Sequence, residues 1–310
     1  MFNNLRELIT SMPDENACRE YIAEQRWHGK PVCPHCGYNK AYIIEGGKKY
    51  KCASKTCYKK FSVTVGTVFE CSNIPLTKWL MALYLATAHK KGISSYQLAK
   101  DIGVAQKSAW FMLHRLREIM SHIPKEILIG TVEIDETYMS RKYRSDYKAL
   151  PPEEVAKMDN LVSKKMNLGA VIGMKERGGN VIVKASFNAK ATAIEKAVKE
   201  NVDTDALLNT DESMKYRKVL SNYKRESVNH SEKEWVRGNV HTNGVENFWS
   251  VMKRGVYGIY HQISYKHLQR YCDEFSYRYN SREIKDSQRF TNSMQQIEGR
   301  LDWKTLTGKK

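Results

Sequence analysis

The spacing of apolar residues changes twice early in the chain. Residues 1–28 have helical spacing that is interrupted at Pro13, which predicts two short helices. Residues 75–123 have helical spacing again and predict three helices. Between these regions, alternating residues and a Gly46-Gly47 turn predict a hairpin and a third strand, at 41–44, 48–51 and 59–65.

A strand-rich pattern follows. Val132 and Ile134 alternate with Glu133 and Asp135, which is the period-two pattern of a half-buried strand. The predicted strands lie at 131–138, 168–174, 180–187 and 206–209, with one helix at 191–200 and another that opens at 241–246. The order strand, strand, strand, helix, strand, helix predicts a mixed sheet with helices packed on it, as in an RNase-H-like core. The fold class is therefore multidomain α+β.

Composition narrows the possible partners. Lys and Arg total 51 against 34 Asp and Glu, so the formal net charge is +17. This surplus favours a polyanion such as nucleic acid, because neutralised phosphates release counterions. No signal-peptide pattern opens the chain, and the longest apolar stretch, at 79–88, has about half the length that spans a bilayer. We therefore expect a cytoplasmic protein without a membrane partner.

Four of the seven cysteines form two close pairs, Cys33 with Cys36 and Cys52 with Cys57. Two thiolate pairs can surround one Zn²⁺ tetrahedrally, and four protein ligands leave no open position for a substrate. We therefore predict a structural zinc in a zinc ribbon, in a reducing compartment. The alternatives are four unrelated reduced cysteines, or His35 as a substitute ligand.

Two segments carry candidate DNA contacts. In the ribbon, lysines interleaved with aromatic residues suit phosphate contact, at Lys48, Lys49, Lys59 and Lys60. Further on, Ala99 is small enough for a close helix crossing and Gly103 permits a tight turn, which resembles a helix-turn-helix. The following helix would enter the major groove near Gln106, Lys107 and Ser108. The alternatives are a solvated charged face, a ribbon that binds protein, and a three-helix bundle that binds no nucleic acid.

Three acids are candidates for a divalent-metal site: Asp135, Asp211 and Glu246. A carboxylate within a buried strand pattern is costly unless it is paired or bound to a metal. Three carboxylates from two strands and a helix can hold two Mg²⁺ or Mn²⁺ ions, which suits phosphodiester chemistry. Lys253 lies two helical turns after Glu246 on the same face and would add a point charge for a phosphate.

The acids also have structural explanations. Asp211 can cap the helix expected after it, and Glu246 can form a capping box with Asn243. Three further acids compete for the role of metal ligand, namely Glu133, Glu136 and Glu212.

Over nearly its whole length, the chain resembles the insertion-sequence transposases of the ISXO-like group. The resemblance rests on the ribbon, the helix-turn-helix-like region, and the stretches Val-Glu-Ile-Asp-Glu-Thr-Tyr, Asn-Thr-Asp-Glu-Ser and His-Thr-Asn-Gly-Val-Glu-Asn-Phe-Trp-Ser-Val-Met-Lys-Arg-Gly. It implies that Asp135 and Asp211 are the two metal aspartates of a DDE-type core. Glu246 is then the third acid, and Lys253 is the basic residue beyond it.

The resemblance also implies an activity. Such a protein binds the terminal inverted repeats of an insertion sequence and catalyses metal-dependent strand cleavage and strand transfer. Its partners are double-stranded DNA ends and target DNA, in a homodimer or larger synaptic assembly at the nucleoid of a bacterial cytoplasm. Two alternatives are a catalytically silent, domesticated DNA-binding protein and an RNase-H-like nuclease that cuts without joining.

The expected domain organisation follows from these patterns. In chain order it comprises N-terminal helices at 1–28, a zinc ribbon at 29–72, a helix-turn-helix-like region at 73–125, an RNase-H-like core at 126–280 and a C-terminal tail at 281–310.

Overall fold

The computed structural model describes residues 2–139, 169–186, 189–229, 232 and 234–308. The sequence of residues 139–166 is rich in Lys and Arg and has little apolar periodicity, which predicts a basic excursion from the core. Apart from Met139, this segment lies outside the described residues. The chain divides into two compact units, and each is described by itself. The first comprises residues 1–123 and 281–310, and the second comprises residues 124–280.

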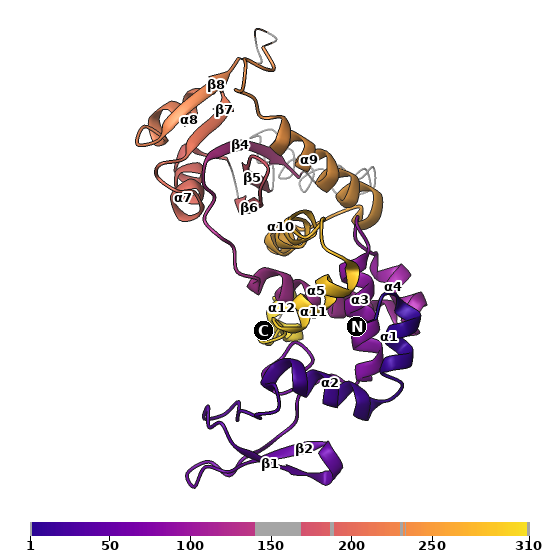
Figure 1. The fold of residues 1–310 in the computed structure, drawn as a ribbon. Helices are drawn as coiled ribbons and strands as arrows, with labels where there is room; N and C mark the ends of the chain where they lie inside the picture. The colour runs from indigo at the N-terminus through magenta and orange to yellow at the C-terminus, as the bar shows by residue number, and fades with distance from the viewer. Residues whose placement is uncertain (1, 140–168, 187–188, 230–231, 233, 309–310) are drawn as a thin grey trace, which may run out of the picture. The chain divides into compact units, whose positions relative to one another are not determined.

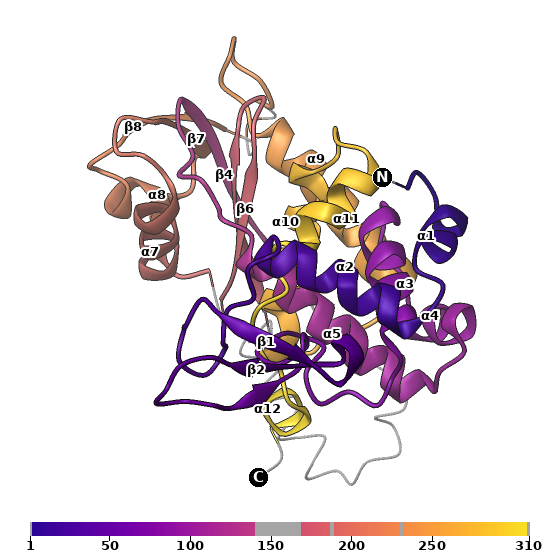
Figure 2. The same cartoon turned by 60° about the horizontal axis from the view of Figure 1, so that its bottom comes forward.

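Helices make up most of the first unit (Figure 2). The described helices of this unit are α1 (Leu5–Ser11), α2 (Glu15–Trp27), α3 (Leu76–Ala88), α4 (Ser95–Ile102), α5 (Gln106–His122), α11 (Asp286–Met294) and α12 (Trp303–Thr307). Asp14 starts α2, because its carboxylate accepts the backbone N–H groups of Asn16 and Ala17. The last helices belong to this unit. Arg289 of α11 is buried, and its guanidinium donates to the carbonyl of Thr87 at 2.8 Å.

A small antiparallel sheet of three strands also belongs to the first unit. Its strands are β1 (Ala41–Ile44), β2 (Lys49–Cys52) and β3 (Lys60–Phe61) in the order β1-β2-β3. β3 is shorter than the 59–65 strand that the pattern predicted, because turns closed by Val65 and Thr67 follow Phe61. Trp27 packs edge-on against Tyr50 at a centroid distance of 4.9 Å, which ties this sheet to the end of α2.

The second unit is built on a mixed sheet of five strands (Figure 1). The strands are β4 (Thr131–Tyr138), β5 (Ala170–Glu176), β6 (Val181–Ser186), β7 (Leu207–Asp211) and β8 (Lys224–Val228), in the order β6-β5-β4-β7-β8. β4, β5 and β6 are antiparallel neighbours, whereas β7 and β8 run parallel to β4. The apolar pattern did not predict β8, because this edge strand is mostly polar and has only Val228 fully buried.

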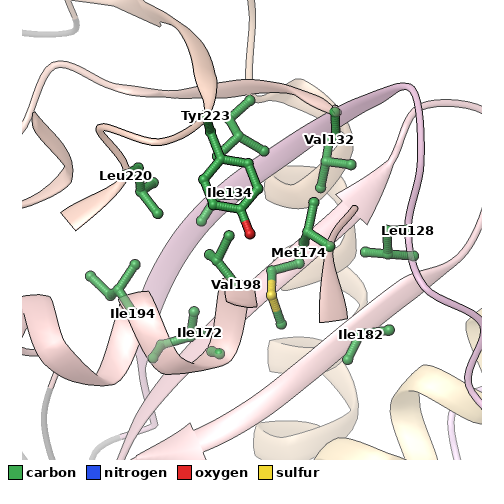
Figure 3. Packing of buried hydrophobic residues seen from close by; sticks show 14 of the residues in the cluster. Leu128, Val132, Ile134, Ile172, Met174, Ile182, Ile194, Val198, Leu220 and Tyr223 are labelled. Atoms are coloured by element: carbon green, nitrogen blue, oxygen red, sulfur yellow. The ribbon is translucent and has the colours of Figure 1, made fainter. Parts of the chain in front are cut away.

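Helices cover both faces of this sheet. α7 (Ala191–Asn201) and the short α8 (Met214–Val219) lie on one face, and α9 (Asn243–Gly255) and α10 (Tyr265–Asn280) lie on the other (Figure 1). The core under α7 contains Val132, Ile134, Ile172, Met174, Ile194 and Val198 (Figure 3). The core under α9 and α10 contains Val171, Val183, Val245, Phe248, Met252 and Phe275.

The edge strand β6 is protected by side chains of α10. Asn280 accepts the N–H of Val181 at 2.8 Å and donates to its carbonyl at 3.0 Å, and Gln269 accepts the N–H of Ala185 at 2.7 Å. These bonds satisfy backbone groups that an exposed edge would offer to another chain. Within the described residues, no helix combines the length and the apolar content that crossing a membrane requires.

Candidate zinc site and acidic site

The four predicted zinc ligands lie together at the base of the β1–β2 hairpin. The Sγ atoms of Cys33, Cys36, Cys52 and Cys57 all lie within 4.8 Å of one another. Cys33 and Cys57 are 3.9 Å apart, and Cys36 and Cys52 are 3.6 Å apart. A tetrahedron with Zn–S bonds of about 2.3 Å has edges of about 3.8 Å, so the thiols fit one zinc ion.

The chemistry of the set also fits a cation. Burial, together with the neighbouring thiols, raises the pKa of Cys52 to about 12, so a metal that binds the set must displace the proton of this thiol. His35 is exposed, and its ring packs near Phe61 at a centroid distance of 6.4 Å. The cysteine set is the only group of at least three potential ligands in such close contact that we find among the described residues.

The candidate acidic site begins on β4. Because side chains alternate along a strand, Glu133 and Asp135 point to the face opposite Val132 and Ile134. Both acids bond to α9. The Val245 N–H donates to Glu133 Oε2 at 3.0 Å, and Trp249 Nε1 donates to Asp135 Oδ2 at 2.9 Å.

Asp211 ends the neighbouring strand β7. β4 and β7 are in parallel register, with Thr131 opposite Leu207 and Glu133 opposite Asn209. The pairing ends there, and each aspartate follows two residues later on its strand; the charge of Asp211 contributes to raising the pKa of Asp135, after the larger effect of burial. Asp211 does not cap α8, whose N-cap is Ser213. Its Oδ1 instead accepts the N–H of Ser213 at 3.1 Å.

Glu246 lies in the first turn of α9. Thr242 is the N-cap of this helix, and its hydroxyl donates to Glu246 Oε1 at 2.8 Å. The alternative of a capping box with Asn243 does not hold, because the N-cap residue is Thr242, its side chain accepts no backbone N–H of the first turn, and the Val245 N–H goes to Glu133. Glu246 is therefore not explained by capping.

Electrostatics connect the three acids. Burial raises the pKa of Asp135 to about 6, the Trp249 hydrogen bond opposes this rise, and the charges of Asp211 and Glu246 add to it. The three carboxylates are not among the described ligand groups whose atoms all lie within 4.8 Å of one another. The carboxylate oxygens are therefore more widely spread than the ligands of a single ion. The two ions of a two-metal site lie about 3.5–4 Å apart, so the ligands of such a site are also more widely separated.

The three competing acids all have cationic partners. Glu133, with 3% of its side chain exposed, lies 3.2 Å from Arg177 and 3.3 Å from His241. Glu136 is bound by Lys215 and by the Tyr216 hydroxyl. Glu212 pairs with Arg217 at 3.3 Å. The hydrogen bond to Asp135 comes instead from a neutral indole, and the Lys215 ammonium that lowers the pKa of Asp135 is itself ion-paired with Glu136.

Sequence reasoning missed Lys215 as a residue of this site. It interacts electrostatically with Asp135 and is ion-paired with Glu136. Lysines are frequent in this chain, so nothing in the sequence singled it out. Lys253, which the resemblance selected, is half-buried on α9. Trp249 was also missed, because the apolar residues of this segment have helical spacing, and that pattern indicates a buried ring without indicating the bond that its N–H group makes.

The residues predicted to contact DNA lie in the first unit. Lys48, Lys49, Lys59 and Lys60 are exposed. Gln106, Lys107 and Ser108 form the first turn of α5, which follows α4 after a turn at Gly103 with φ of 62°. Two of these three have partners. Gln106 donates to Ser95 at 2.8 Å, and the Lys107 ammonium lies over the Trp303 ring at 4.8 Å.

Comparison with known proteins identifies the class as transposases. Residues 127–280 match the family described as ISXO2-like transposase domain, and residues 13–60 match the transposase zinc-ribbon domain. The chain belongs to this family of ISXO-like insertion-sequence transposases, and the prediction of a zinc ribbon is confirmed. One relative is 27% identical over 79% of this chain and 84% of its own length. It is described as an uncharacterized protein in transposable element ISH50 of Halobacterium salinarum.

Loss of zinc ligands should unfold the ribbon. Replacing both Cys36 and Cys52 by Ser is expected to abolish zinc binding and to lower the thermal midpoint, because a small sheet of this size depends on its metal. Zinc content of the purified protein and a thermal unfolding curve measure both effects. Cys71→Ser is the matched control, since Cys71 is exposed and lies outside the set. Full zinc content in the double variant would contradict a four-cysteine site.

Removing the charge of Asp135 and removing the charge of Glu133 should change the stability of the protein in opposite directions. The folded-state pKa of Asp135 is about 6, above the ordinary value of 3.8. Its stabilising contribution is therefore complete below pH 3.8 and is lost as the pH rises through about 6. At neutral pH without Mg²⁺, Asp135→Asn should stabilise the protein by up to about 3 kcal/mol.

Glu133→Gln is the matched control for that measurement. It removes a charge that Arg177 compensates, so it should destabilise the protein by about 3 kcal/mol. Urea unfolding at pH 7.5 and at pH 4 measures both variants, and the Asp135→Asn gain should shrink at the lower pH. Equal losses in both variants at pH 7.5 would show that Asp135 is compensated like Glu133.

Proposed function

We propose that this protein is a DNA transposase that binds the terminal inverted repeats of its element and catalyses metal-dependent strand cleavage and strand transfer. The observation that carries the proposal is that Asp135 and Asp211 follow the paired ends of the parallel neighbours β4 and β7 and interact electrostatically, in a chain of a transposase family. Glu246 contributes to the same charge cluster from α9.

The sheet topology supports an RNase-H-like catalytic core. Three antiparallel strands are followed in the chain by two strands parallel to the first, and the first strand lies at the centre of the sheet. Asp135 and Asp211 then sit on adjacent parallel strands, toward the carboxyl end of the sheet. Ligands of open α/β sheets bind at this end.

The donor set fits hard divalent cations. Asp135, Asp211 and Glu246 would hold two Mg²⁺ or Mn²⁺ ions, because these ions prefer carboxylate oxygens and would relieve the repulsion that raises the pKa of Asp135. When bound, such a pair of ions activates a water or a 3′-hydroxyl and stabilises the leaving oxygen. Lys253 would contribute a point charge to a DNA phosphate.

The proposed reaction has two steps at one site. Hydrolysis breaks a phosphodiester at the end of the element and frees a 3′-hydroxyl. That hydroxyl then attacks a target phosphodiester, so one P–O bond forms while another breaks and the number of phosphodiesters stays constant. The protein residues bind and orient the two DNA strands for both steps.

DNA recognition is proposed for the first unit. The exposed ribbon lysines suit phosphate contact, and the α4–Gly103–α5 turn suits a helix-turn-helix whose second helix reads the major groove. Joining two ends requires a dimer or a larger assembly on double-stranded DNA. We propose that this assembly acts at the nucleoid in the cytoplasm.

Cleavage and joining of a labelled duplex that carries an element end test the proposal. With Mg²⁺, the wild-type protein should produce both nicked and joined products. Asp211→Asn should reduce both by at least about 100-fold, a typical loss when one preorganised group is removed, while end binding is retained. Glu212→Gln is the matched control and should stay active, because Glu212 is exposed and paired with Arg217.

Other outcomes of the same assay would overturn the proposal. Nicks without joined products would identify a nuclease. Binding without any product would identify a DNA-binding protein that no longer cuts. Unchanged cleavage by Asp211→Asn would remove Asp211 from the mechanism.

A further inference from the structure

Helix α9 is fastened to strand β4 at two points with matching spacing. Glu133 and Asp135 are two residues apart on one face of the strand, about 6.6 Å along its axis. Their partners on the helix, the Val245 N–H and the Trp249 side chain, are four residues apart, about 6 Å along the helix axis. The two bonds therefore fix both the position and the register of α9 on β4.

Two glycines make room for these contacts. Gly173 lies opposite Asp135 on β5, and a Cβ there would lie 2.5 Å from Trp249 Cζ2. A Cβ at Gly244 would lie 2.7 Å from Glu133 Oε2. Any larger residue at either position would displace the group that makes the bond. The indole and the Glu133 carboxylate are thus packed directly against main chain.

The two acids that bond to α9 differ in whether a cation compensates their charge. Glu133 is ion-paired with Arg177 and accepts the Val245 N–H, so it acts as a structural anchor for the start of α9. Trp249 is neutral, and it can hold one oxygen of Asp135 without cancelling the negative charge that a cation needs. A buried Trp in an ordinary core also requires an acceptor for its N–H. Here the acceptor is a proposed metal ligand.

We propose that Trp249 is a positioning residue of the acidic site. Its N–H holds Oδ2 of Asp135 and couples Asp135 to the helix that carries Glu246, which would leave the other oxygen of Asp135 available to a divalent ion. Glu246 lies three residues before Trp249, so the single indole sets the separation of two ligands on different elements. This inference rests on the proposed metal-dependent function, because it assigns Trp249 a role only if Asp135 binds metal.

Trp249→Phe tests the role, because it removes the N–H and keeps an aromatic ring against Gly173. The Mg²⁺ concentration that gives half-maximal cleavage should rise about tenfold, as is typical when an outer-shell partner of a metal ligand is lost. Cleavage at saturating Mg²⁺ should largely recover. Gly173→Ala should raise the same concentration, since it displaces the ring without removing a polar group.

A structural role alone predicts a different result. If Trp249 only packs in the core, Trp249→Phe would lower the urea midpoint in Mg²⁺-free buffer and leave the half-maximal Mg²⁺ concentration unchanged. That pattern would overturn the inference while the wild-type cleavage and joining stand.

Terbium luminescence provides a readout that does not depend on activity. Tb³⁺ binds hard oxygen ligands, and at Asp135 it would lie about 5 Å from the indole, close enough for excitation of Trp249 to sensitise its emission. Sensitised emission that Mg²⁺ displaces should occur in the wild type and be lost in Asp135→Asn. Gly173→Ala keeps the indole but displaces it, so this variant should need about tenfold more Tb³⁺ for half-maximal emission. Trp235→Phe is the matched control and should keep the emission, because Trp235 is 56% exposed.

The terbium experiment distinguishes failure of the positioning role of Trp249 from failure of the metal site. An unchanged half-maximal Tb³⁺ concentration in Gly173→Ala would overturn the positioning role and leave the metal site intact. If the wild type shows no terbium binding that Mg²⁺ displaces, the metal site itself fails, and the proposed function fails with it.

Discussion

Asp135 carries a negative charge in a partly buried position next to two further acids, and much of the second unit is arranged around this charge. Burial and the neighbouring charges both raise the pKa of its carboxyl group to about 6. A fold that gained nothing from this charge would neutralise it, as it does for Glu133 two residues earlier. The two acids on one strand face therefore have different environments, because Arg177 pairs with Glu133 whereas a neutral indole bonds to Asp135.

The sheet explains how such a charge is tolerated. Alternation along β4 sends Val132 and Ile134 into the core under α7, and the acids face α9. The apolar face stabilises the sheet through burial, so the other face can hold polar groups at its carboxyl end. The edge strand β6 is protected by α10, which confines the polar chemistry to the β4 and β7 strand ends.

In the first unit, the constraint is the small size of the sheet beside the zinc site. A sheet of three short strands buries little apolar surface, so it requires a metal to hold its turns together. The Cys33–Cys57 and Cys36–Cys52 distances match the edges of a zinc-thiolate tetrahedron. The ribbon can therefore present exposed lysines on a rigid base although its core is small.

Local signals in the sequence determined a large part of this structure. The paired cysteines, the period-two pattern at Thr131–Tyr138 and the αL glycine at Gly103 each act over a few residues, and each predicted feature is present. β8 escaped prediction because a polar edge strand acquires its conformation from pairing with β7, not from its own periodicity. The C-terminal helices likewise join the first unit through distant contacts, such as that of Arg289 with Thr87.

In the acidic site, too, some features follow from local sequence and others from distant contacts. The sequence by itself determined that Glu133 and Asp135 share a strand face, because side chains alternate along any strand. Only the tertiary structure decided which acid is neutralised, since Arg177, His241 and Trp249 lie far along the chain from β4. Lys215 became part of the site in the same way, through β7 and α8. A carboxylate's charge and direction depend on partners that only the fold brings within hydrogen-bond distance.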